Sequence, residues 1–464
     1  MKKIFYNKEQ LLEYSNIEIV RHSLKKENTV LNFRETDREK IGRLTGQYCH
    51  LLKDDKVRVY YEVHEPESVC YAESDDGGIT FKKSMDNPVL EHSLACHNFS
   101  AFIDTNPNAK IKFKAIGGYH VGKDYSSHKS CRCNNMGIEL KNCLEPCWPK
   151  IPRQIFVDNI NHPCQGNGYY IWESEDGINW KILYDKPVLS SFTKVKGYND
   201  VGYMSFDNIP TIFYDDNINE YILYSRNNVK LGVRHVLYTK SKDLINWDEP
   251  KDINIDPEFD YNHDNLYYPG IYKYPGTDDY ISFTPYFKNI IHDDKGEHRT
   301  YYDECTMIMY SKDRENWKIE DRILKSDNPE WKGHMKHPHI SGFIESPDKK
   351  EFYLYAHWDF TTDHNTLIRY SIRKDGFSSI QAGEKEGYFI LDKKLNSSKI
   401  VLNCLVKENG FIDIDYLDDK FQVIGNRYIN SGDYLDKEII CDFVKDFYLK
   451  IKLKNANIFS IKFE

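Results

Sequence analysis

Hydrophobic and polar residues alternate in short runs along most of the chain, and one such run recurs with its following turn. Each copy has an apolar strand, a Ser, an acidic turn and then an aromatic residue. The copies are Tyr71–Phe81, Trp172–Trp180, Tyr238–Trp247, Tyr310–Trp317 and, in a weaker form, Tyr370–Phe377. Alternation with a period of two predicts half-buried strands. A strand-and-turn unit that recurs in this way predicts the blades of a β-propeller.

The spacing of the copies predicts the number of blades. Ser174, Ser241 and Ser311 are 67 and 70 residues apart, whereas Ser74 lies 100 residues before Ser174. The excess falls at 119–165, which predicts a long insertion in the second blade. Five copies predict five blades, with six as the alternative.

Candidate inner strands and Tyr-rich second strands lie between the copies. The inner strands are expected at Gly46–Leu52, Cys96–Ile103, Val201–Asp207 with Thr211–Tyr214, Leu266–Tyr272 and His337–Ile344. The second strands are expected at Arg58–Glu62, Ile111–Ile116, Tyr221–Tyr224, Tyr280–Phe283 and Glu351–Tyr355. Polar residues where the inner strands begin are expected to point into a central funnel.

The sequence pattern changes after Phe377. Short alternating strands with polar turns fill Ser397–Glu464, without a blade signature. The sequence therefore predicts an all-β protein in which a five-bladed β-propeller (1–384, N-terminal segment included) precedes a small C-terminal β-sandwich (385–464).

Composition favours β structure, and its aromatic content suits either sugar recognition or simply a Tyr-rich β protein. The chain has 35 Tyr and 24 Phe among 464 residues, and both residue types suit half-buried strands. Aromatic faces stack on sugar rings, and carboxylates and amides bind pairs of hydroxyls. The net charge of −9 argues against nucleic-acid binding, which needs a basic face.

Neither a membrane span nor export is predicted. No apolar run reaches the ~18–20 residues that a membrane span needs. Met1–Lys8 begins like a signal peptide but no apolar segment follows, so a cytoplasmic location is expected. The eleven cysteines are then interpreted as reduced thiols. Cys131, Cys133, Cys143 and Cys147 form a CxC…CxxxC pattern, which indicates either a weak zinc site or a cysteine-bearing loop. No other cofactor is expected.

Several motifs resemble one group of bacterial proteins, those of the glycosyl hydrolase family 32-like type. They are Asn98 with Phe102–Pro107 and Phe113–Gly118, Gly232–Val236 with Ser241–Trp247, Arg373–Ala382 and the terminal Ala456–Phe463. The resemblance covers nearly the whole chain. It implies the five-bladed propeller of families 32, 43 and 68, with three carboxylates on inner strands of successive blades.

The chain also departs from the invertase pattern of that group. It lacks the Trp-Met-Asn-Asp-Pro-Asn-Gly box and any Arg-Asp-Pro or Glu-Cys-Pro motif. Activity on sucrose or fructans is therefore not expected.

Glycoside hydrolysis usually needs two carboxyl groups in different environments, and propeller geometry places them near the axis. The predicted catalytic candidates are Asp207, Glu62, Glu304 and Asp104. Asp207 is the leading candidate for base or nucleophile, and Glu62 or Glu304 for the acid. Each has a structural alternative, and for Asp104, in Asp-Thr-Asn-Pro, we favour a turn role.

The predicted substrate-binding residues lie where the inner strands begin or beside them. They are His97, Asn98, Asn208, Arg234, Tyr268, His337 and His339. His334, His357 and Arg226 are further candidates, because imidazoles and guanidinium groups bind hydroxyls, phosphate or acidic substituents. Packing is the alternative role for the histidines, and a salt bridge is the alternative for the arginines.

Three functions remain open from the sequence. The first is a glycosidase acting on a bacterial glycan or small glycoside. The second is a glycosyl transferase or phosphorylase on the same propeller. The third is a propeller that binds glycans without catalysis. A carbohydrate is the expected partner in each case, and the sequence does not determine the oligomeric state.

Overall fold

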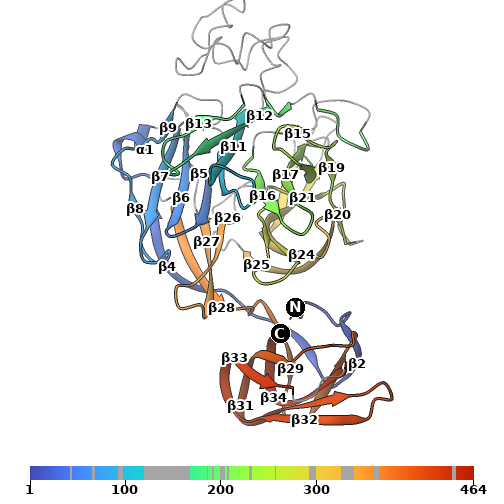
Figure 1. The fold of residues 1–464 in the computed structure, drawn as a ribbon. Helices are drawn as coiled ribbons and strands as arrows, with labels where there is room; N and C mark the ends of the chain where they lie inside the picture. Colours follow the sequence, from blue (N-terminus) through green and yellow to red (C-terminus); the bar gives the residue numbers. More distant parts are fainter. Residues whose placement is uncertain are drawn as a thin grey trace, which may run out of the picture.

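A computed structural model of the 464-residue chain shows two β bodies, the propeller above and a smaller domain below in Figure 1. The described residues are 1–41, 44–64, 68–91, 98–119, 168–184, 187–190, 193–198, 204–205, 208–228, 233–256, 258–291, 299–325, 339–358, 365–441 and 446–464. The one helix among them is α1 (Asp37–Ile41). No helix in these ranges has the length and apolar character of a membrane span.

Five antiparallel sheets form the propeller, each with its inner strand first. Blade I has β5 (Leu44–Lys53), β6 (Val57–His64), β7 (Ser68–Ser74), β8 (Lys82–Lys83) and β9 (Leu90–Glu91). Blade II has β10 (Ser100–Ile103), β11 (Phe113–Tyr119), β12 (Gly168–Ser174), β13 (Lys181–Ile182) and β14 (Leu189–Ser190). Blade III has β15 (Met204–Ser205), β16 (Thr211–Asp215), β17 (Glu220–Asn228), β18 (Arg234–Ser241) and β19 (Lys251–Asp252).

The remaining blades close the ring. Blade IV has β21 (Asp264–Leu266), β22 (Ile271–Lys273), β23 (Tyr280–Ile291), β24 (Arg299–Ser311) and β25 (Asn316–Lys325), with β20 (Asn254–Ile255) added in parallel to β25. Blade V has β26 (His339–Glu345), β27 (Glu351–Trp358) and β28 (Thr366–Arg373), and its outer strand is the N-terminal β4 (Lys25–Asn32). The predicted five-bladed propeller is confirmed, and the six-bladed alternative is wrong.

The recurring turns have the structure that their sequence predicts. In the first copy the Asp76 carboxylate accepts hydrogen bonds from the backbone N–H groups of Ile79 (3.0 Å) and Thr80 (2.9 Å), and Ser74 donates to it (2.7 Å). Asp176, Asp243 and Asp313 repeat this pattern. These aspartates therefore stabilise turns.

The aromatic residue of each signature fills the gap between blades. Trp317, only 2% exposed, packs in the core between blades III and IV. Trp180 lies 5.8 Å from Tyr60 and 5.1 Å from Phe99, ring centre to ring centre. Burying a large aromatic side chain stabilises a fold by about 1.5–3 kcal/mol, so this one position contributes strongly to blade packing.

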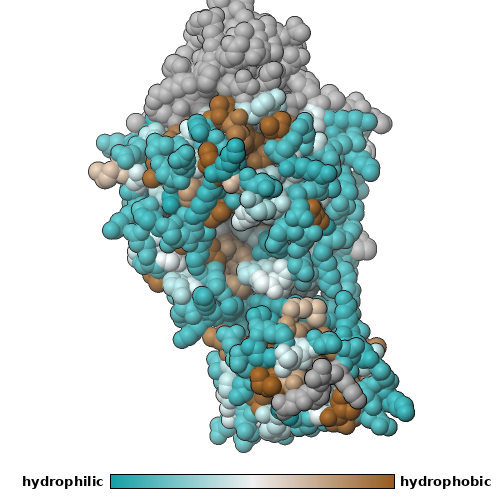
Figure 2. Space-filling model, in the orientation of Figure 1, coloured by the Kyte–Doolittle hydropathy of each residue, from teal (hydrophilic) through white to brown (hydrophobic). Residues whose placement is uncertain are grey.

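The C-terminal domain is a sandwich built on two long strands. It contains β29 (Ser378–Ala382), β30 (Gly387–Leu391), β31 (Lys399–Leu417), β32 (Val423–Ile429), β33 (Gly432–Ile440) and β34 (Tyr448–Phe463). One half of β31 pairs with β33 and the other with β32, so the sheet folds over a shared apolar core. Figure 2 shows isolated hydrophobic groups among hydrophilic ones on the face of this domain in view.

The N-terminus belongs to this sandwich. The strands β1 (Lys2–Ile4), β2 (Leu11–Ser15) and β3 (Glu18–Arg21) pair with β34, β30 and β29. The pairing thus groups 2–21 and 378–382 with the C-terminal strands, on the other side of the boundary expected at residue 384. Ion pairs link the two bodies, for example Lys2 to Asp375 (2.5 Å) and Arg21 to Glu320.

Candidate functional site

The inner strands lose their regular pairing at the end of the propeller where they begin. In blade III the inner strand is split into β15 and β16, and in blade IV into β21 and β22. Blade I has a register shift between Thr45 and Cys49, and blade V between Ile340 and Gly342. Irregular strand segments release polar groups from the ladder, so this end of the axis is where side chains can serve a ligand.

Five predicted or neighbouring residues from blades III, IV and V lie near the breaks in the inner strands. The Asn208 side chain, 0% exposed, donates from Nδ2 to the Tyr267 carbonyl. The ring of His339 lies 5.5 Å from the Tyr267 ring and 5.0 Å from the Tyr268 ring. The Asn208 carboxamide oxygen is buried, and no described residue donates a hydrogen bond to it. We call Asn208, Tyr267, Tyr268, His339 and Arg234 the axial cluster.

Tyr268 has a structural bond within this cluster. Its hydroxyl donates to the Ile340 carbonyl at 2.6 Å and so ties blade IV to blade V. Burial raises the pKa of Tyr268 well above its usual range. Tyr268 is therefore a neutral hydrogen-bond donor whose hydroxyl holds the cluster in place. Only its ring is left to contact a ligand.

Two arginines bring positive charge to the cluster. The Arg226 guanidinium lies 5.2 Å from the Tyr267 ring centre, and that of Arg234 lies 5.6 Å from it. Arg226 is 2% exposed, and the Arg234 backbone N–H is held by the Asn265 side chain at 2.8 Å. Guanidinium groups over an aromatic face gain cation–π attraction, and they are the side chains best suited to bind carboxylates and phosphates.

A second buried imidazole joins blade V to blade I. Nε2 of His357 contacts Oδ1 of Asn365, and Nδ2 of Asn365 donates to the Thr45 carbonyl. The amide nitrogen is thus a donor and its oxygen an acceptor, so the proton of His357 lies on Nε2. His357 is 6.4 Å from His339 between ring centres. The contact with Asn365 fixes the tautomer next to the axial cluster.

Glu62 is a buried carboxylate at the same end of blade I. It is 1% exposed, and Oε1 accepts the Phe99 backbone N–H at 2.8 Å. Asn98 precedes that residue, is fully buried and has a φ of 61°, a left-handed conformation that Asn tolerates. Glu62 and Asn98 therefore form one group between blades I and II, beside the start of β10.

The other two carboxylate candidates lie elsewhere. Glu304 is half-buried on β24, the third strand of blade IV, about 10 Å from the inner strand at the usual strand spacing. Asp104 lies at the opposite end of β10. It accepts the Tyr221 hydroxyl on both oxygens (3.1 and 3.0 Å) and the Asn106 N–H at 3.1 Å, and burial raises its pKa. Its contacts are those of a turn that joins blades II and III.

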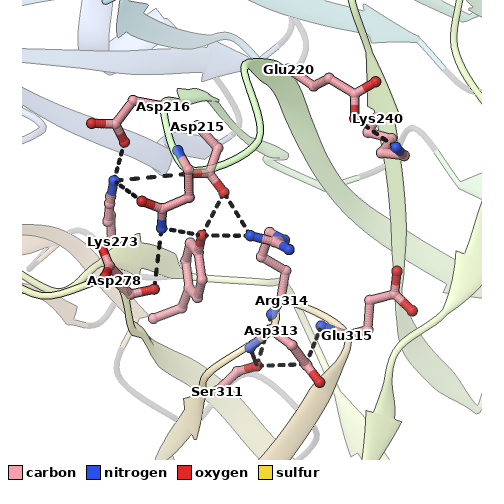
Figure 3. Close-up of polar contacts among 12 residues, drawn as sticks. Asp215, Asp216, Glu220, Lys240, Lys273, Asp278, Ser311, Asp313, Arg314 and Glu315 are labelled. Carbon is pink, nitrogen blue, oxygen red and sulfur yellow. Dashed lines mark hydrogen bonds and ion pairs between the residues drawn. The ribbon is translucent and has the colours of Figure 1, made fainter.

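Asp215 has a related position between blades III and IV, as Figure 3 shows. It is 0% exposed and accepts the Tyr280 hydroxyl at 2.5 Å, Nη1 of Arg314 at 3.3 Å and the Asn217 N–H at 3.0 Å. Asp104 and Asp215 thus occupy similar places at the far end of the propeller, where polar contacts hold adjacent blades.

Several predicted residues lie outside the described ranges. They are the catalytic candidate Asp207, the binding candidates His97 and His337, the further histidine His334, the cysteines Cys131, Cys133, Cys143 and Cys147, and the insertion at 119–165 except Tyr119. Among the described residues, no group of three or more His, Cys, Asp or Glu side chains is arranged to hold a metal.

The sequence analysis missed Tyr267, Thr45 and Asn365. Tyr267 is next to the predicted Tyr268, and the Tyr-Tyr-Pro-Gly segment is a signal for a strand break. Thr45 takes part through its carbonyl, and Asn365 lies in a connection without a motif, so no local pattern marks either residue.

The comparisons with known proteins are weak. No family model matches the sequence, and no curated protein matches it. A solved N-acetylgalactosamine deacetylase from F. plautii, in complex with blood group B trisaccharide, has 14% identity and a TM-score of 0.44 over 76% of this chain and 96% of that one. A glycoside hydrolase family 43 arabinoxylan arabinofuranohydrolase from Bacillus subtilis, in complex with cellotetraose, has 12% identity and a TM-score of 0.40 over 91% and 96%.

A mannose phosphorylase from Leishmania mexicana, in complex with phosphate ion, has 12% identity and a TM-score of 0.41 over 75% of this chain and 89% of that one. At these values the similarities carry no argument about activity. The five-bladed fold rests on the strand pairing described above.

Proposed function

We propose that this protein is a glycan-acting enzyme whose substrate enters the propeller at the axial cluster. The observation that carries the proposal is the buried Asn208 carboxamide oxygen beside the rings of Tyr267 and His339, to which no residue in the described ranges donates a hydrogen bond. An unpaired buried acceptor is costly, and a sugar hydroxyl is a suitable donor for it. Aromatic rings with a few placed polar groups are typical of ligand sites.

The proposed reaction is glycosidic bond cleavage by two carboxyl groups. Asp207, next to Asn208 in the chain, would act as base or nucleophile. Glu62 is the favoured acid, because it is buried at the same end of the propeller and on the second strand, whereas Glu304 lies on the third. A separation of ~5–5.5 Å between the two carboxyl groups would give retention, and ~6.5–9.5 Å inversion.

The resemblance to the family 32-like group supports this proposal through its motifs. We further propose that the chain belongs to that group and that the protein is cytoplasmic. The missing invertase boxes direct the search towards glycosides other than sucrose and fructans.

The test is turnover of a panel of aryl glycosides and oligosaccharides. Asp207→Asn and Glu62→Gln are each expected to lower kcat/KM by about 100-fold or more, the usual contribution of an acid or base. Glu220→Gln is the matched control, because Glu220 is on β17 at the far end and pairs with Lys240. Full activity of both site variants, or loss of activity in the control at unchanged thermal stability, would refute the assignment.

A phosphorylase is the second candidate, and the two guanidinium groups at Tyr267 favour it. Phosphate would replace water as the attacking group, and Arg226 or Arg234 would bind it. The expected result is turnover that depends on inorganic phosphate and that Arg234→Gln weakens chiefly through the KM for phosphate. Turnover with water alone would contradict this alternative and leave the hydrolase.

A further inference from the structure

The outer face of the sandwich carries two stacked aromatic pairs, each with one exposed and one half-buried ring. Phe411 and Tyr428 lie 5.5 Å apart with 20° between their planes, and Phe421 and Tyr448 lie 5.0 Å apart with 23°. Tyr428 is 56% exposed and Phe421 47%. Alternate residues of β31, such as Ile412 and Ile414, pack in the core, so these rings are on the other face of the sheet.

Polar groups fill the space between the two pairs. Asp413 faces Tyr428 on one neighbouring strand and Lys452 on the other. Asn426 donates to Asp415 at 2.8 Å, and Lys452 pairs with Asp415 at 2.7 Å. From Asp413 to Leu417, which faces Tyr448, the strand rises about 13 Å. The face is therefore a strip with rings at both ends and hydrogen-bonding groups in the middle.

The backbone at Phe421 is strained. Its φ is 56°, which is unfavourable for a bulky residue. The Asp418 carboxylate holds the loop by accepting the N–H groups of Lys420 (2.8 Å) and Gln422 (2.9 Å). The chain thus adopts an unfavourable backbone conformation where the exposed ring of Phe421 stacks on Tyr448. Strain of this kind often marks binding sites.

We propose that this strip, the aromatic platform (Phe411, Tyr428, Phe421, Tyr448, Asp413 and Asn426), binds an oligosaccharide separately from the propeller axis. A sugar chain presents apolar ring faces and hydroxyls together, which matches rings that flank the Asp413 carboxylate and the Asn426 amide. Asp415, 4% exposed, lies beneath and holds the Asn426 side chain. A protein partner fits less well, because the cores of protein interfaces are depleted in charged residues. Single-stranded nucleic acid needs a basic groove, whereas the central Lys452 is neutralised here by ion pairs with Asp413 and Asp415.

The proposal does not depend on catalysis at the axis. β31 and β32 lie at the end of the molecule remote from the propeller (Figure 1). A ligand held there would keep the enzyme on a polymer, since a second linked site raises the effective concentration of the first.

The test is affinity electrophoresis of the full-length protein in native gels that contain arabinoxylan, arabinan, mannan or bacterial cell-wall polysaccharide. We expect at least one polymer to retard the protein. Phe421→Ala and Tyr428→Ala should each weaken the apparent affinity by about 3- to 10-fold, in the range of single aromatic contacts. Tyr428→Phe keeps the ring and should bind as the parent does.

Two controls separate this site from the axis. Tyr14→Ala removes another exposed ring of the same domain, 46% exposed and outside the platform, and should not change retardation. Glu62→Gln should retain it even where turnover is lost. Absence of retardation in all gels, or retardation that Phe421→Ala and Tyr428→Ala leave unchanged at equal thermal stability, would overturn the proposal without touching the proposed enzyme activity.

Discussion

The contact between blades III and IV in Figure 3 gives a sharp test of how the propeller is held together. Asp215 is fully buried and its oxygens accept from Tyr280, Arg314 and Asn217, with Nζ of Lys273 at 3.8 Å. Asp215→Ala would remove the acceptor of the Tyr280 hydroxyl and the carboxylate partner of Arg314, which would keep its contact with the Tyr280 oxygen at 3.1 Å.

The size of the expected loss in free energy of unfolding follows from the burial of Asp215. Removing one partner of a buried ion pair costs about 3–5 kcal/mol. Arg314 is 19% exposed in its side chain, so water can partly solvate it, and we expect the lower end, about 3 kcal/mol. Tyr280→Phe removes the hydrogen bond that the hydroxyl donates to Asp215 and those that it accepts from Arg314 and Asn217. The bond to the Asp215 carboxylate alone contributes about 1.5–3 kcal/mol. The double variant should cost less than the sum by about 1–2 kcal/mol, because both changes delete the same contact.

The neighbouring aspartate is the matched control. Asp216 also contacts Lys273, but its side chain is 76% exposed. Asp216→Ala should therefore change stability by no more than about 0.5 kcal/mol, as for other exposed ion pairs.

The assay is urea denaturation followed by tryptophan fluorescence, in which Trp317 reports on this same interface. The four variants are compared through their midpoints at equal m-values. Equal midpoints for Asp215→Ala and Asp216→Ala, or strict additivity of Asp215→Ala and Tyr280→Phe, would refute the view that this network joins the blades.

Two further predictions concern a pH dependence and a predicted site residue. Burial raises the pKa of Glu320 to about 7, although Arg21 opposes this. The pKa of a glutamate in the unfolded chain is ~4.3. Between these two pH values only the folded state holds the proton, so the free energy of unfolding falls as pH rises. The total is about 4 kcal/mol, of which about 2–3 kcal/mol is lost between pH 5 and 7.5. Thermal melts of the parent and Glu320→Gln at these two pH values should show this loss only in the parent, and equal losses would contradict the prediction. Asp104→Asn should lower stability by about 1–3 kcal/mol through its bonds to Tyr221 and leave glycan turnover intact, whereas lost turnover at unchanged melting temperature would return Asp104 to the catalytic candidates.

The sequence by itself determined the repeating unit. The Ser and Asp of each turn, such as Ser74 and Asp76, bond to groups within about four residues, so the chemistry is local and readable. The blade count followed from these turns. The change of sequence pattern after Phe377 also indicated a second domain.

Only the tertiary structure decided which residues meet. Asn208 and Tyr267 are 59 positions apart, and Asp104 and Tyr221 are 117 apart. The N-terminal β4 closes blade V although more than 300 residues separate it from β28. Such contacts depend on how the blades close into a ring, and no local pattern encodes that closure. The local sequence favoured a turn role for Asp104 and left Glu62 a candidate acid, but only the fold shows that Asp104 joins two blades through Tyr221 and that Glu62 lies beside the start of an inner strand.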